Sequence, residues 1–95
     1  MIQRILKVSN RSGIHTRPAS LIAKTATAFR SSILFKKDGM EINGKSVMGI
    51  LTLGCIYNDV IEMLCQGPQE VEQADAIESL FASRFEKAYE KEDMI

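Results

Sequence analysis

The sequence predicts an α+β domain of two layers, in which helices cover one face of a mainly antiparallel sheet. Two observations carry this prediction. The hydrophobic pattern switches between the period of strands and the period of helices in the order βαββαβα. The connections are short, and Asp38-Gly39 separates two strand-like segments as the tight turn of a hairpin does. Short connections and a hairpin favour antiparallel neighbours.

The first half of the chain contains a strand, a helix and the hairpin. Residues 2–8 predict the first strand, with Ile2, Leu6 and Val8 on one side and Gln3, Ile5 and Lys7 on the other. A helix is expected over residues 16–29, because apolar side chains recur there at helical spacing. This stripe consists of Ala19, Ile22, Ala23, Ala26 and Phe29. The hairpin strands are residues 32–37 and 40–43.

The second half predicts a short helix, a strand and a long helix. Ser46 supplies an N-cap oxygen for the short helix, and Gly54 can adopt the left-handed conformation after its last turn. Residues 59–65 form the last strand, and Gly67-Pro68 ends it. A long amphipathic helix follows over residues 70–91. Its apolar side chains are Val71, Ala74, Ile77, Phe81, Phe85 and Ala88, and Lys87 and Lys91 suit its C-terminal end.

The composition bounds the chain to a single domain over residues 1–95. With 95 residues, of which 45% are hydrophobic, it can build one modest core. We expect residues 2–90 to be ordered and the C-terminal tail to fray. The chain starts without an apolar run of signal-peptide length, and no segment is long enough to span a membrane, so a cytoplasmic protein is expected.

The cysteines and the single histidine do not form a recognisable metal site. Cys55, Cys65 and His15 are the only residues of these types. They fit neither a zinc site nor a disulfide scaffold, and no cofactor is implied. Both thiols are expected to be reduced and buried, with one structural disulfide as the alternative.

The charges are balanced in number but not in position. The chain has 12 basic and 12 acidic side chains, yet residues 1–37 contain eight cations and no carboxylate. Either the two halves fold against each other and largely cancel, or the surface around His15 is basic and suits an acidic or phosphorylated partner. Nothing in the sequence indicates binding of nucleic acid.

The stretch GIHTRPA, residues 13–19, holds the candidate chemistry. His15 directly precedes the predicted helix, and Pro18 lies in the first turn, where its missing NH costs nothing. The backbone NH groups of Thr16 and Arg17 converge near the imidazole, and they favour an anion together with the helix dipole. The guanidinium fork of Arg17 matches phosphate oxygens. These residue types indicate a phosphohistidine site.

Of two other interpretations of His15, the sequence leaves one open and argues against the other. A histidine in a polar loop can also be a solvated turn residue, and residue chemistry alone leaves that alternative open. A hydrolytic triad is not indicated, because the sequence has no glycine-flanked nucleophile elbow.

GIHTRPA resembles the active-site motif of the HPr family, the histidine-containing phosphocarriers of the bacterial phosphoenolpyruvate-dependent sugar phosphotransferase system. NGKSVMGILTLG, residues 43–54, resembles the second motif of that family. The resemblance covers about residues 2–88, and the predicted element order is the family order. It implies an open-faced sandwich with a four-stranded antiparallel sheet in the order 1-4-2-3 and three helices on one face.

The resemblance also implies roles for individual residues. His15 would accept a phosphoryl group on Nδ1 from phosphorylated enzyme I and pass it to a IIA domain of a sugar permease, and Arg17 would steady the phosphate. Such a protein is a stoichiometric carrier rather than an enzyme, and is expected to be a monomer. The family positions that dock these partners are Ser20, Lys24, Val47, Met48 and Leu51.

Ser46 has two expected roles. As an N-cap it contributes about 1 kcal/mol to the stability of the short helix. KSVMG also resembles carriers that are regulated on this serine by the bifunctional HPr kinase/phosphorylase, and a phosphate there would oppose an acidic partner.

Three alternatives to a carrier for sugar uptake stay open. The chain could be a mainly regulatory module that binds a transcriptional regulator, a carrier of the nitrogen-type phosphotransfer branch, or a structural domain with an inert histidine. Thr27 and Gly49, where some family members carry lysine, bear on the partner range.

Overall fold

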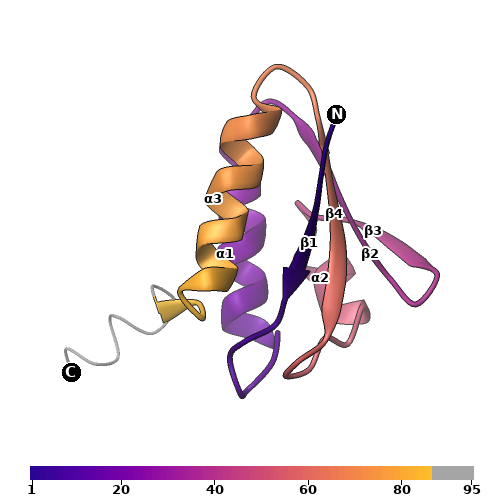
Figure 1. The fold of residues 1–95 in the computed structure, drawn as a ribbon, viewed down its shortest axis with the longest axis vertical. Coiled ribbons are helices and arrows are strands. Elements are labelled where there is room, and N and C mark those ends of the chain that lie inside the picture. The colour runs from indigo at the N-terminus through magenta and orange to yellow at the C-terminus, as the bar shows by residue number, and fades with distance from the viewer. Residues whose placement is uncertain (87–95) are drawn as a thin grey trace.

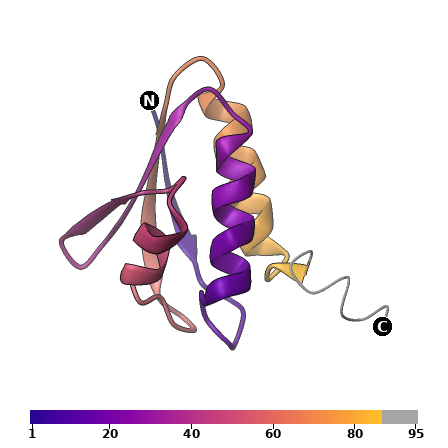
Figure 2. The ribbon, with the colours of Figure 1, turned by 180° about the vertical axis from the view of Figure 1, so that it is seen from behind.

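The structure is a computed structural model that describes residues 1–86. Its elements are β1 (Ile2–Lys7), α1 (Thr16–Thr27), β2 (Ser32–Lys37), β3 (Met40–Asn43), α2 (Val47–Thr52), β4 (Val60–Gln66) and α3 (Glu70–Ala82). All strand pairs are antiparallel, in the order β1-β4-β2-β3. Helices α1 and α3 lie side by side against one face of the sheet, with α2 beside the end of α1 (Figures 1 and 2). The predicted two-layer α+β fold is confirmed.

The core lies between the sheet and the helices. Alternation along the strands turns one set of side chains toward the helices, so that in β4 Ile61, Met63 and Cys65 are buried while Val60 is exposed. The predicted stripe of α1 meets them, with four of its five members buried and Phe29 partly buried. The two cysteines are free thiols inside this core, as expected.

The hairpin forms at the predicted turn. β2 and β3 pair from Leu34 with Asn43 to Lys37 with Met40. Asp38 and Gly39 have φ angles of 51° and 81°, the left-handed values that a two-residue hairpin turn needs.

Helix α3 is shorter than predicted. It ends at Ala82, where the prediction continues to residue 91. The amide of Arg84 donates to the Phe81 carbonyl at 3.2 Å, and the amide of Phe85 donates to the Leu80 carbonyl at 2.9 Å. This is the hydrogen-bond pattern of a Schellman C-cap, with Arg84 in the left-handed region at φ 58°. Phe85 is nevertheless buried, because the turn packs its ring against that of Phe81, with 4.8 Å between the two ring centroids.

Other parts of the α3 prediction have mixed outcomes. Val71 is 46% exposed, so its place in the apolar stripe was wrong, whereas Ala74, Ile77 and Phe81 are buried. Ala88, Lys87, Lys91 and the tail lie outside the described residues. Within residues 1–86, no helix combines the length and apolar character needed to cross a membrane.

Candidate functional site

His15 lies at the N-terminus of α1, as the sequence predicts. It is the N-cap residue, with an extended backbone at φ −107° and ψ −159°, and its carbonyl accepts from the Ala19 amide at 2.9 Å. Its side chain is exposed and makes no capping hydrogen bond. The imidazole therefore stands at the positive end of the helix dipole, where a negative group is stabilised.

The first turn of α1 carries the other predicted groups. Thr16 and Arg17 are exposed, and Pro18 is buried with Ala19 beneath them. The first turn has no acidic side chain to offset the dipole. Helix geometry leaves the earliest NH groups of any helix without an acceptor inside the helix, so an anion beside His15 would meet donors there.

A second loop supports the loop that precedes His15. The Ile14 amide donates to the Cys55 carbonyl at 3.0 Å. Gly13 has φ +72°, and a Cβ added to it would come within 2.8 Å of the same carbonyl oxygen. Asn10 closes the other side, since its side-chain Nδ2 donates to the Gly13 carbonyl at 2.6 Å. A backbone hydrogen bond on one side and the Asn10 side chain on the other thus fix the approach of the chain to His15.

The supporting loop consists of residues 53–59, which we call the 53–59 loop. It pairs with the end of β1, because the Val8 amide donates to the Asp59 carbonyl and the Asn58 amide donates to the Val8 carbonyl, both at 2.8 Å. The Ile56 amide donates to the Asp59 carboxylate at 2.8 Å. This bond, more than the nearby Lys37 ammonium, lowers the pKa of Asp59. Figures 1 and 2 place this loop and the β1–α1 loop at the same end of the molecule.

Ser46 is the N-cap of α2. Its Oγ accepts from the Gly49 amide at 3.0 Å, and Gly54 follows the helix with φ +61°, so both predicted end signals are confirmed. Ser46 is partly buried.

The predicted docking residues lie on α1 and α2, which pack against each other. Ser20 and Lys24 are exposed on α1, and Met48 on α2 is 72% exposed. Val47 and Leu51 are partly buried and pack against the core, so Met48 is the member that presents most apolar surface. Thr27 donates its hydroxyl to the Ala23 carbonyl at 2.7 Å.

Two exposed apolar residues beside the site were missed by the sequence interpretation. Ile56 is 66% exposed and Tyr57 is 42% exposed, both in the 53–59 loop. The guanidinium of Arg11 lies 5.6 Å from the centre of the Tyr57 ring, within cation–π range. No periodic pattern marks a short turn, but two bulky apolar residues between Gly54 and Asn58 were the available signal.

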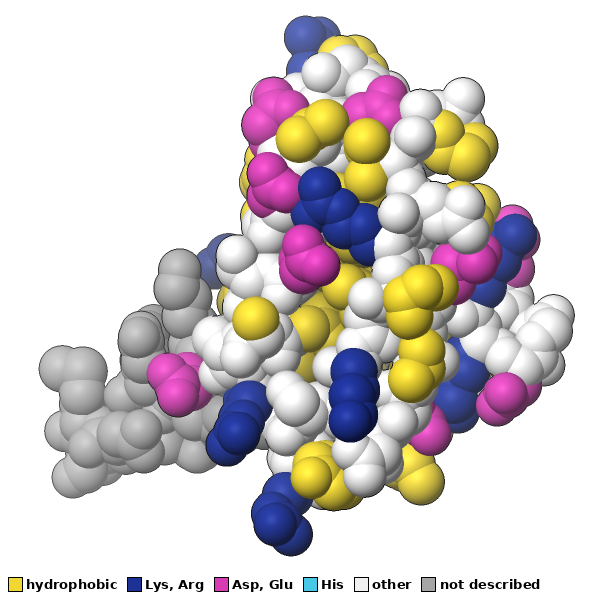
Figure 3. Space-filling view, in the orientation of Figure 1, with side chains coloured by type: hydrophobic (Ala, Val, Ile, Leu, Met, Phe, Trp, Pro, Cys, Tyr) yellow, Lys and Arg dark blue, Asp and Glu magenta, His cyan; other side chains and the backbone are white. Residues whose placement is uncertain are grey.

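The cations of residues 1–37 were expected either to be cancelled by the second half of the chain or to form a basic surface, and the structure shows some of each. Arg4 pairs with Asp75 and Glu78, and Lys36 and Lys37 also have acidic partners. Within the described part of the chain, Arg11 and Lys24 form no ion pair. Figure 3, in the orientation of Figure 1, shows Lys and Arg side chains at the lower end of the molecule, which is the end where Figure 1 places the β1–α1 loop. Part of the positive charge is thus neutralised by carboxylates of the second half, whereas Arg11 and Lys24 keep their charge without an ion pair among the described residues.

Comparison with known proteins identifies the family. The family model described as "PTS HPr component phosphorylation site" matches residues 2–83. The chain belongs to the HPr family. HPr proteins are phosphocarriers, and the phosphotransfer role of this chain follows from that membership.

Individual HPr relatives agree along almost the whole chain. The phosphocarrier protein HPr of Treponema pallidum is 38% identical over 87 residues, which cover 92% of this chain and 99% of the relative. The crystal structure of HPr from Thermoanaerobacter tengcongensis superposes with a TM-score of 0.86 at 36% identity, covering 90% and 96% of the two chains. The Bacillus subtilis catabolite repression protein Crh, described as a domain-swapped dimer, gives a TM-score of 0.68 at 28% identity, covering 90% and 97%.

Proposed function

We propose that His15 is the phosphoryl acceptor of this HPr protein. Its Nδ1 would attack the phosphorus carried by enzyme I, so that the Nδ1–P bond forms as the bond between phosphorus and enzyme I breaks. The same exchange with a IIA domain of a sugar permease would discharge it. The observation that supports this proposal is the exposed imidazole at the N-cap of α1, on a chain of the HPr family.

The surroundings of His15 suit phosphoryl transfer, which depends mainly on positioning and on electrostatic stabilisation. The donors of the first turn, Thr16 and Arg17, would hold the phosphate oxygens, and the Arg17 guanidinium would match them two at a time. As a member of the HPr family with a single histidine, each chain would carry one phosphoryl group and act as a stoichiometric carrier rather than as an enzyme.

Enzyme I and phosphoenolpyruvate test the acceptor directly. We expect close to one acid-labile, alkali-stable phosphate per chain, and none in His15→Ala. Arg17→Lys keeps the charge but loses the planar fork, and should be labelled about tenfold more slowly. Equal labelling of wild type and His15→Ala would refute the assignment.

Partner docking would use Ser20, Lys24, Val47, Met48 and Leu51. An exposed apolar side chain, Met48, with a cation on the neighbouring helix suits partners that bind transiently and in succession. Monomeric state and cytoplasmic location belong to the same proposal, as does a single domain over residues 1–95. Because Crh is described as a dimer, the oligomeric state should be measured by light scattering across a concentration series.

Ser46 would be the regulatory site, phosphorylated by an HPr kinase/phosphorylase. The hydroxyl sits at a helix N-terminus, where a phosphate can be accommodated by the fold while it repels an acidic partner. Ser46→Asp should keep the cap and the stability but lower kcat/KM with enzyme I. Ser46→Ala should lose about 1 kcal/mol of stability and retain docking. Equal kcat/KM in the two variants would refute the switch.

A regulatory function is the second candidate, favoured by the likeness to Crh, which is described as a catabolite repression protein. Here a transcriptional regulator would bind the form phosphorylated on Ser46. Affinity capture from lysate, with and without that phosphate, distinguishes the two, since identical partner sets would rule out the regulatory role. The motif KSVMG favours the sugar branch over the nitrogen branch.

A further inference from the structure

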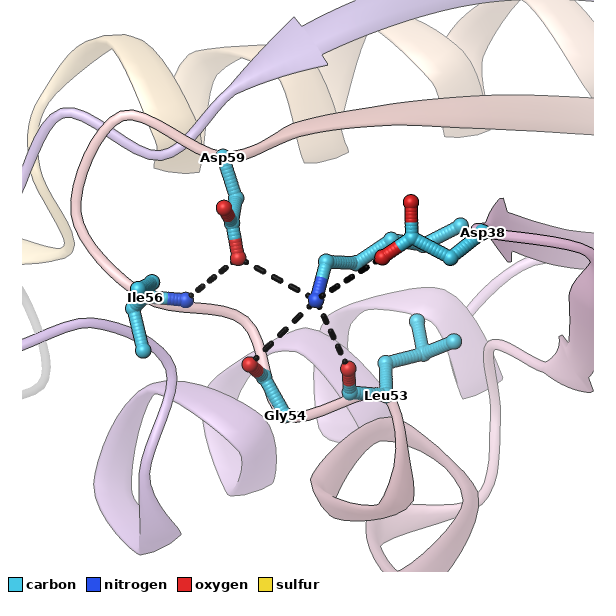
Figure 4. A network of polar contacts seen from close by, with 6 residues as sticks. Asp38, Leu53, Gly54, Ile56 and Asp59 are labelled. Carbon is cyan, nitrogen blue, oxygen red and sulfur yellow. Dashed lines mark hydrogen bonds and ion pairs between the residues drawn. The ribbon is translucent and has the colours of Figure 1, made fainter.

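The Lys37 ammonium occupies a position that the site described above does not explain. Its Nζ donates to the carbonyls of Leu53 at 3.1 Å and Gly54 at 3.4 Å, and it lies 3.2 Å from an Asp59 carboxylate oxygen (Figure 4). The Asp38 carboxylate lies at 3.7 Å. The Lys37 side chain is only 15% exposed, whereas that of Lys36 beside it is 43% exposed. One cation therefore joins the end of β2 to both ends of the 53–59 loop.

The contacts of Lys37 differ in kind from an ordinary surface ion pair. Backbone carbonyls at the end of α2 are the negative end of that helix, and a cation satisfies them well. Asp59 is already held by the Ile56 amide, so both of its partners fix one rotamer. The hydrogen bond to Asp59 raises the pKa of Lys37, which keeps the ammonium charged.

The 53–59 loop in turn positions the residues next to His15. Its Cys55 carbonyl accepts from the Ile14 amide, and Gly13 packs against the same carbonyl. The loop also presents Ile56 and Tyr57 to solvent beside the site. Displacing the loop would therefore change both the setting of the His15 loop and the apolar surface near it.

We propose that Lys37 is a positioning residue for phosphoryl transfer, which acts by clamping the 53–59 loop against the loop that precedes His15. The effect on phosphoryl transfer rests on the proposed function of His15, whereas the clamp on the 53–59 loop does not depend on it. Lys37 touches neither the phosphoryl group nor the imidazole. Its effect reaches them through Asp59, the α2 carbonyls and Cys55.

Amide hydrogen exchange of the unphosphorylated protein tests the structural part. In Lys37→Met, exchange at the Ile14 and Ile56 amides should be faster by about tenfold, while the slowest amides of β4 change much less. Lys37→Arg should restore slow exchange, because it keeps the charge and the donors. Lys36→Met is the matched control, since Lys36 pairs only with Glu41 among the described residues. Unchanged exchange in Lys37→Met would overturn the clamp.

Kinetics with enzyme I test the functional part. With Lys37→Met as the substrate of enzyme I, the KM should rise about fivefold and kcat should change less. With Lys37→Arg, the KM should return to the wild-type value. Faster exchange without any change in KM would overturn the positioning role. The double variant Lys37→Met, Asp59→Asn should still show a raised KM. If its KM returned to the wild-type value, Lys37 would act only by neutralising the charge of Asp59, and the positioning role would be overturned. If wild-type protein accepts no phosphate at all, the proposed function fails, while the exchange result still stands.

Discussion

The Ile14 amide donates to the Cys55 carbonyl at 3.0 Å, and this bond joins the two loops that meet at the His15 end of the molecule. One loop follows β1 and the other precedes β4, which are neighbouring strands in the sheet. The setting of His15 thus depends on a residue far away in sequence.

Gly13→Ala should disturb this contact directly. The change places a Cβ within 2.8 Å of a backbone oxygen at a φ of +72°. We expect a loss of at least about 2 kcal/mol in the free energy of unfolding and slower phosphorylation of His15. Gly39→Ala is the control, since Gly39 has a similar φ of +81° and nothing within 4 Å of the new Cβ. It should cost about 1 kcal/mol and leave phosphorylation unchanged. Equal losses in urea titrations would contradict the prediction.

Met48→Ala should separate docking from stability. Because the Met48 side chain is 72% exposed, its removal should change the free energy of unfolding by less than about 0.5 kcal/mol. The kcat/KM with enzyme I should fall about fivefold if Met48 is an apolar anchor. Val71→Ala removes an exposed apolar side chain from α3 and should alter neither quantity. A kcat/KM for Met48→Ala equal to that of Val71→Ala would remove Met48 from the docking surface.

Arg84→Gly should stabilise the protein. Arg84 has φ 58° at the position after the α3 C-cap, where glycine avoids the strain of a side chain. We expect a gain of about 1 kcal/mol in the free energy of unfolding. Ser83→Gly is the control, because Ser83 has φ −85° and gains nothing from glycine. A melting temperature of Arg84→Gly at or below that of wild type would contradict the strain.

Cys65 should make stability fall in alkaline solution. Burial raises its pKa from 9.0 to about 11. Between these values the thiol is ionised in the unfolded chain but protonated in the folded one, so the unfolded state binds fewer protons and the free energy of unfolding falls as pH rises. Cys65→Ala should be less stable overall but show a shallower loss from pH 9 to 11 in urea titrations. Parallel curves for the two proteins would show that Cys65 does not titrate in this way.

Local signals in the sequence predicted much of this structure. Ser46 and Gly54 mark the ends of α2, because capping depends on residues within one turn. His15 was placed correctly at the start of α1 for the same reason. The end of α3 was missed, since Phe81 and Phe85 keep helical spacing across a turn that contains no glycine.

Non-local contacts could not be predicted in this way. Lys37 reads as an ordinary cation at the end of a strand, and its partners at residues 53–59 come to it only through the folded sheet. Likewise, the support of His15 by Cys55 depends on the pairing of β1 with β4. Such contacts follow from strand order rather than from any short stretch of sequence.

The antiparallel register of β1 and β4 makes the setting of His15 depend on folding. Lys7 lies opposite Val60, so the loops that follow and precede these residues meet only when the pairing is in register. A slip of one residue would turn the buried face of β1 outward and separate Ile14 from Cys55. The surroundings of the proposed acceptor are therefore assembled by the pairing of the two strands that lie farthest apart in sequence, and a partly folded protein would retain His15 without these surroundings.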